Sequence, residues 1–214
     1  ASIDDCHFEE GWSYALVSSE YQGALHQRLL IRVEHGKYLV ADRALSPEPH
    51  RYTWQLNGNG GGDSGGQFAL ADSGASWERT GASLLVAVAS TEGVGVLGHH
   101  LEEHSVHHGV WGTHEMLTLD AEMNAQAGFF AWVEAVPAGL ASTQASISTP
   151  HPGVVQIVLE GDTSVAYAFF NRTEEAVQLS GDWPAGNSSL TVLPGVAWVG
   201  PDGETRGATF PTPE

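Results

Sequence analysis

The chain has 214 residues, 42% of them hydrophobic, which is enough to bury a core without help from disulfides. Its 26 acidic residues against 8 basic ones give a formal net charge of −18, so we expect no binding to nucleic acid or to anionic membranes, which need basic surfaces. No apolar run approaches the roughly 18 residues of a membrane-spanning helix, and Cys6 as the single cysteine excludes an intrachain disulfide.

Short segments of alternating apolar and polar residues run along the chain and predict β-strands. Residues 29–33 and 38–41 flank Gly36, which can take the positive φ of a tight turn, so they predict an antiparallel hairpin. A strand at 52–56 leads into the glycine-rich stretch 57–66, which predicts a flexible surface loop. Further strands are expected at 67–71, 84–89, 94–97, 116–121 and 129–136.

The last third of the chain continues this pattern, with strands expected at 154–159, 165–170, 176–179, 189–193 and 196–199. The polar stretch 137–153 holds three prolines and predicts a long crossing loop or a boundary between two packed sheets. The sequence therefore predicts an all-β protein, an antiparallel stacked-sheet β-sandwich with very little helix. We divide it into a main sandwich of residues 1–148 and C-terminal strands of residues 149–214, which pack in the same body or as a small appended sheet.

Two segments, taken together, resemble a known family. In the first, Tyr21-Gln22-Gly23 precedes an arginine-bearing strand at 26–31, a tyrosine-containing strand ending in aspartate at 38–43, and a strand with histidine and aromatic residues at 50–56. The second runs from Trp111-Gly112-Thr113-His114 through Phe129-Phe130-Ala131-Trp132 to Pro137. These segments resemble the C-terminal β-sandwich domain of heparinase II/III-like polysaccharide lyases.

The resemblance implies a module of a secreted or periplasmic enzyme that cleaves uronate-containing polysaccharides by β-elimination. In that family an α/α toroid of helices supplies the Tyr, Asn and His that do the chemistry, and the β body forms one wall of the cleft. Because this chain lacks amphipathic helices, we assign it no catalytic residue, and we expect the toroid upstream or in a partner chain. The alternative is a stand-alone, non-catalytic carbohydrate-binding or adhesive domain.

The resemblance also implies a divalent metal, usually zinc, held by two histidines and an aspartate, and His26 and Asp42 match two of those positions. We expect the hairpin to bring His26 and Asp42 opposite each other. Where the family places a histidine beside an aromatic residue, this chain has Gln55 after Trp54, so His50 becomes the third candidate, across a bend or bulge. The alternative is that His26 and Asp42 pair by a hydrogen bond and hold no metal.

The candidate residues for binding a polysaccharide are Arg28, Trp54, Trp111 and His114, all of which lie in the two resembling segments. Exposed indoles stack on sugar rings, whereas tryptophans elsewhere in the chain are expected in the core. An anionic glycan is repelled by the acidic chain unless basic residues gather locally, and the arginines able to do so are Arg28, Arg32, Arg43 and Arg51.

Six histidines fall close together in the sequence: His99, His100, His104, His107, His108 and His114. Imidazole is a common zinc ligand, so this density suggests a second metal hypothesis. On a strand His99 and His100 point to opposite faces, whereas on a helical turn His100 and His104 share a face. The flanking glycines and glutamates favour the simpler interpretation, a solvated surface loop.

Overall fold

The structure, a computed structural model, describes residues 1–91, 95–107, 110–121, 123–184 and 187–211. These residues form antiparallel strands and contain no α-helix; the three-residue 3₁₀ turn Gly62–Ser64 lies between β5 (Thr53–Asn57) and β6 (Gln67–Ala71). The predicted all-β sandwich class is therefore confirmed. None of the described residues form a helix long and apolar enough to cross a membrane.

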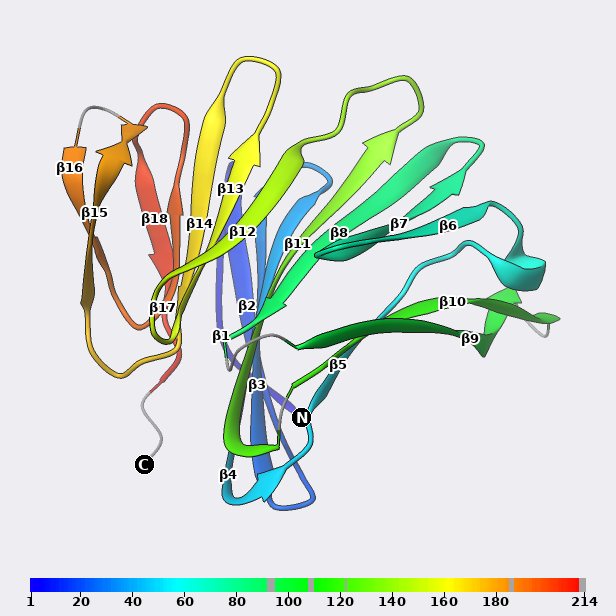
Figure 1. Cartoon of the computed structure of the whole chain (residues 1–214), viewed down its shortest axis with the longest axis horizontal. Coiled ribbons are helices and arrows are strands. Elements are labelled where there is room, and N and C mark those ends of the chain that lie inside the picture. Colours follow the sequence, from blue (N-terminus) through cyan, green and yellow to red (C-terminus); the bar gives the residue numbers. More distant parts are fainter. Residues whose placement is uncertain (92–94, 108–109, 122, 185–186, 212–214) are drawn as a thin grey trace.

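The strands form four sheets that stack side by side (Figure 1). The largest sheet has eight strands, in the order β1 (Ser2–Glu9), β2 (Trp12–Tyr21), β3 (Ala24–Glu34), β4 (Lys37–His50), β11 (Asn124–Pro137), β8 (Ala82–Ser90), β7 (Gly74–Arg79) and β6. A three-stranded sheet of β5, β10 (Val110–Asp120) and β9 (Val96–His107) lies on one side of it.

The other side of the eight-stranded sheet carries a five-stranded sheet, in the order β12 (Gln144–His151), β13 (Val154–Glu160), β14 (Val165–Asn171), β17 (Gly195–Val199) and β18 (Thr205–Ala208). A two-stranded sheet of β15 (Val177–Trp183) and β16 (Asn187–Val192) forms the outermost layer (Figure 1). The boundary expected between residues 148 and 149 falls inside β12.

Each interface between layers is filled by one apolar cluster. The eight-stranded and five-stranded sheets bury the largest cluster, which includes Leu29, Ile31, Phe130, Ile157 and Phe170. The eight-stranded and three-stranded sheets bury a second, which includes Trp77, Phe129, Trp54, Leu117 and Leu119. A third lies between the five-stranded and two-stranded sheets and includes Phe169, Leu179 and Val192. Because both faces of the central sheet are covered over much of its area, alternate residues of its strands point into different cores.

The structure differs from the sequence-based expectations in several segments. Strands β1, β2, β7 and β18 were not predicted. Strand β12 occupies the stretch expected to be a loop or boundary, and β9 occupies the histidine-rich stretch expected to be a solvated loop. The glycine-rich stretch 57–66 packs tightly instead of moving freely in solvent, because a Cβ on Gly58 would lie 2.1 Å from the Trp77 ring. Val94 and His108, named in the predictions above, lie outside the described residues.

Candidate functional site

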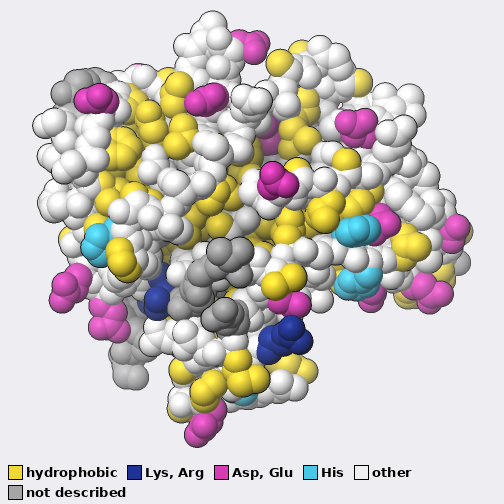
Figure 2. All heavy atoms as spheres, viewed as in Figure 1, with side chains coloured by type: hydrophobic (Ala, Val, Ile, Leu, Met, Phe, Trp, Pro, Cys, Tyr) yellow, Lys and Arg dark blue, Asp and Glu magenta, His cyan; other side chains and the backbone are white. Residues whose placement is uncertain are grey.

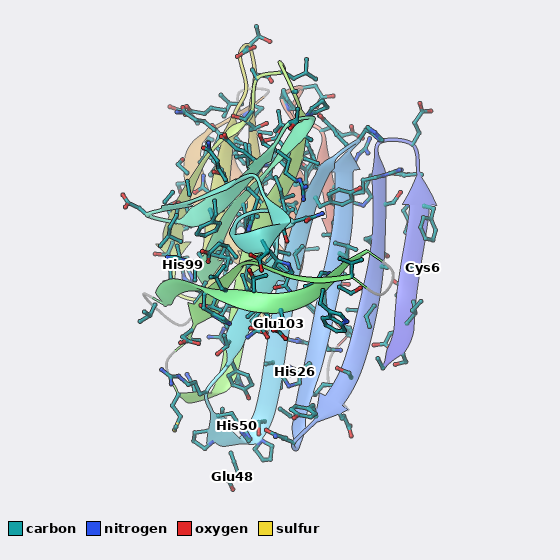
Figure 3. The ribbon with its side chains drawn as sticks, turned by 90° about the vertical axis from the view of Figure 1, so that its right-hand side faces the viewer. Cys6, His26, Glu48, His50, His99 and Glu103 are labelled. Carbon is teal, nitrogen blue, oxygen red and sulfur yellow. The ribbon has the colours of Figure 1, made fainter. Side chains whose placement is uncertain are left out.

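The main candidate site is a cleft of about 710 Å³ where the three-stranded sheet diverges from the eight-stranded sheet. One wall is the face of β2, β3 and β4 that carries Ser19, His26 and Asp42. The other wall is the segment from His50 to Gln55, which leaves the end of β4 and enters β5. Figure 3 shows this face of the large sheet, with His26 and His50 in its lower part and the strand that carries His99 and Glu103 crossing above them.

An ion pair between neighbouring strands occupies the centre of the first wall. Arg28 on β3 lies directly opposite Asp42 on β4, and it donates from Nε to Oδ1 at 2.6 Å and from Nη2 to Oδ2 at 2.9 Å. These hydrogen bonds raise the pKa of Arg28, although burial opposes the shift. Both oxygens of the Asp42 carboxylate are therefore engaged by one guanidinium, which is the strongest form of such a pair.

The expectation that His26 lies directly opposite Asp42 is wrong. The two-residue turn at His35 and Gly36 sets Glu34 opposite Lys37, and a register shift between Arg32 and Glu34 then places Ala44 opposite His26. His26 and Asp42 consequently share a face of the sheet as diagonal neighbours. The cause is the position of the turn: a pairing of His26 with Asp42 requires a turn centred on residue 34, whereas the turn lies at His35 and Gly36, and the bulge then shifts the register by one residue.

Three aromatic rings form the lower end of the cleft. Tyr52 lies between the two histidines, with ring centres 6.0 Å from His26 and 6.0 Å from His50. Burial lowers the pKa of His26; the Asp42 carboxylate opposes this shift, and the neighbouring His50 adds to it. At neutral pH His26 is therefore an uncharged imidazole, able to accept or donate a hydrogen bond to a ligand in the cleft.

The three residues named for zinc do not fit a zinc ion in this arrangement. Each oxygen of Asp42 already accepts a hydrogen bond from the Arg28 guanidinium, and the Tyr52 ring lies between His26 and His50. Across the described part of the chain, no three His, Cys, Asp or Glu side chains form a group that can hold a metal ion. Zinc at His26, Asp42 and His50 therefore stays a prediction, and no chemistry is assigned to it here.

The four residues named for polysaccharide binding do not lie together. Arg28 and Trp54 line the cleft, but Trp54 is only 4% exposed and packs in the core between the sheets, so it offers no open face to a sugar. Trp111 is 69% exposed but lies far from Trp54. Trp54 pairs with Leu119 on β10, and Trp111 lies eight residues, or roughly 26 Å, along that strand from Leu119. His114 is buried next to the glycine-rich stretch, outside the cleft.

The arginines near the cleft are mostly committed to other partners. Arg43 is next to the cleft in the chain, but its side chain turns to the opposite face of the sheet, where it donates to Gln27 and to the Pro211 carbonyl and lies over the Phe210 ring. Arg51 is exposed and approaches Asp120 at 3.8 Å. In the view of Figure 2 basic side chains are visible at two separate places in the lower half, whereas acidic ones are scattered over the whole face.

Two tyrosines of the cleft were not identified as site residues from the sequence. Tyr21, at the end of β2, is 67% exposed, and Tyr52 closes the lower end between the histidines. Both lie in the first resembling segment, which was the available signal. An exposed tyrosine combines a flat apolar ring with a polar hydroxyl, so Tyr21 is better placed than Trp54 to contact a sugar.

Comparisons with known proteins identify the fold. No protein-family model and no curated protein matches the sequence. Among solved structures, heparinase III matches with a TM-score of 0.60 and 12% identity, over 79% of this chain and 27% of that chain. The heparinase III BT4657 gene product matches with a TM-score of 0.63 and 8% identity, over 79% of this chain and 27% of that chain. The heparan sulfate lyase HepC of Pedobacter heparinus matches with a TM-score of 0.57 and 14% identity, over 95% of this chain and 28% of that chain.

These likenesses have two limits. Their sequence identities are low, so they establish a shared fold. This chain also spans little more than a quarter of each heparinase, so it corresponds to one part of those proteins. Within those limits, the chain has the heparinase-like β-sandwich fold that residues 21–137 implied.

Proposed function

We propose that this chain is the β-sandwich module of a heparinase-like polysaccharide lyase and forms one wall of a cleft for a uronate-containing glycan. The observation that carries the proposal is the fold likeness, which covers most of this chain and only about 27% of the heparinases. A cleft with an arginine, an exposed tyrosine and an uncharged histidine is consistent with a polysaccharide ligand. A secreted or periplasmic location is part of the same proposal.

The uncovered face of the large sheet supports a helical partner domain. Beyond the three-stranded sheet, the cleft-side face of β1, β2 and β3 has no covering layer among the described residues. It exposes apolar side chains whose register places them on that face, namely Ile3, Phe8, Tyr21 and Leu30. Large exposed apolar side chains on an uncovered sheet face are typical of an interface, and a helical toroid packed here would complete the cleft.

The test is expression of the complete natural reading frame that contains this chain. We expect about 350 residues of helical pattern upstream of Ala1, on the usual size of such domains, and release of unsaturated uronate products by the whole protein. In that protein Tyr21→Ala should raise KM more than it lowers kcat, because Tyr21 binds the glycan without touching the reacting bond. Leu193→Ala, which removes another exposed apolar side chain outside the cleft, is the control and should leave KM unchanged.

The alternative, a stand-alone carbohydrate-binding or adhesive domain, predicts a different outcome. A reading frame that encodes only a leader upstream, together with glycan binding by the 214-residue chain and no lyase activity, would favour it over the lyase module.

A further inference from the structure

A second candidate site lies on the three-stranded sheet, around a buried histidine without a hydrogen-bond partner. His114 on β10 is 2% exposed, and neither Nδ1 nor Nε2 has a partner among the described residues. A buried imidazole in this state has lost its hydrogen bonds to water at both nitrogens without gaining any from the protein. Such a cost indicates that something other than this chain's own side chains satisfies the ring.

His114 borders a small cavity of about 100 Å³ that lies outside the cleft described above. The cavity is lined by Asn57, Gly58, Asn59, His104, Ser105 and His114. Polar groups thus surround it on several sides, and its volume accommodates an ion with bound water. The close packing of Gly58 on Trp77 fixes the 57–59 segment that forms one side.

The strand register brings His104 and His114 together. Gly112 pairs with His104 and His114 pairs with Glu102, so the two histidines are diagonal neighbours on one face of the β9–β10 hairpin. Their ring centres lie 4.7 Å apart, with an angle of 69° between the planes. Two imidazoles bound to one ion at about 2.0–2.1 Å have ring centres roughly 4.5–5.2 Å apart at octahedral to tetrahedral angles, so the observed separation suits joint coordination.

Burial and the Glu102 carboxylate act in opposite directions on charge in the cavity. Burial lowers the pKa of His114, and the nearby His104 adds to that shift while the Glu102 carboxylate opposes it. The ring is therefore neutral at pH 7 and keeps a lone pair for a ligand. Glu102 supplies negative charge directly across the strand pair, and the chain as a whole carries −18.

We propose that His104 and His114 bind a divalent transition-metal ion of the nickel, copper and zinc class, with water and the oxygens of Asn57, Asn59 or Ser105 completing its coordination. Imidazole nitrogen is a preferred ligand for this class of ion. The site is separate from the His26, Asp42 and His50 set, with which it shares no residue.

The test is a titration of the full, untagged and metal-stripped chain with copper(II), followed by calorimetry and electron paramagnetic resonance. Copper is the probe because it binds nitrogen sites most tightly of the series and its spectrum reports the nitrogens bound to it. We expect one saturable site with splitting from two imidazole nitrogens. His104→Gln and His114→Gln should each weaken binding by at least about tenfold, the loss that even an outer partner of a metal ligand causes.

Two control variants make the outcome decisive. His99→Gln changes a residue of the same strand, but the His99 side chain bonds Glu115 on the opposite face of the sheet from His104 and His114. His26→Ala changes a residue of the separate cleft. Neither variant should alter the affinity for copper. Because His104 is exposed, its variant should fold even if the His114 variant does not, and circular dichroism checks both. The proposal is overturned if no saturable binding occurs, which leaves water as the occupant, if binding survives His104→Gln, or if His26→Ala abolishes it.

Discussion

The ion pair between Arg28 and Asp42 allows a quantitative prediction about the cleft wall. The pair is bidentate and directly cross-strand, with side-chain exposures of 52% for Arg28 and 16% for Asp42. Fully exposed pairs contribute about 0.2–1 kcal/mol, and hydrogen bonds to charged groups about 1.5–3 kcal/mol. Because one partner is half exposed and the other nearly buried, we expect a coupling free energy of about 1 kcal/mol between the two side chains.

The assay is a double-mutant cycle in urea with the chain, Arg28→Met, Asp42→Asn and the double variant. Methionine keeps the apolar stem of the arginine and asparagine keeps the shape of the carboxyl group, so the cycle isolates the charge interaction. Asp42→Asn should lower the melting temperature by about 2–4 °C, the shift for roughly 1 kcal/mol in a chain of this size.

The cross-strand pair at the tip of the same hairpin provides the control. Lys37 and Glu34 form a single contact of 3.0 Å with exposures of 31% and 58%, and their coupling should be smaller, about 0.2–0.5 kcal/mol. A coupling between Arg28 and Asp42 within about 0.5 kcal/mol of zero, the usual limit of additivity, would refute the reasoning.

Three further predictions concern the glycine-rich stretch, the edge strand and catalysis. Gly58→Ala should destabilise the chain by about 1–3 kcal/mol in urea unfolding because its Cβ meets the Trp77 ring, whereas Gly81→Ala, with nothing within 4 Å, should change stability by less than about 0.5 kcal/mol. The Tyr14 hydroxyl donates a hydrogen bond to Asp5 Oδ2 at 2.9 Å, and this bond raises the pKa of Tyr14. The stabilising effect of the bond is therefore fully present below the pKa of about 10 of an unfolded tyrosine, and it is lost as the pH rises through the higher pKa of the folded chain. Asp5→Asn should lower that pKa in an ultraviolet titration of the phenolate, and an unchanged titration would show that the bond is not formed. The isolated chain should release no unsaturated uronate from heparan sulfate, hyaluronan, chondroitin or alginate, and robust turnover by the pure chain would contradict the assignment of catalysis to a helical partner.

The strands predicted best from the sequence are those whose residues alternate between a buried apolar face and a polar face. Residues 29–33 and 38–41 were recognised as strands because buried apolar residues stand at every second position, as Leu29 and Ile31 do in the first strand. Gly36 between the two strands has the positive φ, 76°, that the turn requires. Strand β1 escaped prediction because every one of its residues is exposed, so no burial alternates along it. Strand β12 escaped because it is an edge strand, where Pro150 is tolerated and polar residues face solvent.

The candidate sites were harder to predict because they depend on register. The pairing of Arg28 with Asp42 rests on a one-residue shift between Arg32 and Glu34, and no residue type in the sequence announces that bulge. The neighbourhood of His104 and His114 likewise depends on how β9 pairs with β10. Periodicity identifies a strand, but the partner of each residue is fixed by turns and bulges that only the folded chain reveals.

The charges around the cleft bear on where β-elimination would take place under the proposed function. β-Elimination requires neutralisation of the uronate carboxylate, and a cationic or hydrogen-bonding group must face that carboxylate. In the described cleft Arg28 is engaged by Asp42, Arg43 points to the opposite face, and Arg51 approaches Asp120. An arginine already paired with a carboxylate must exchange that partner to bind another, which weakens its attraction for the glycan. Under the proposed function, most of the positive charge for the reaction would therefore come from a helical domain outside this wall.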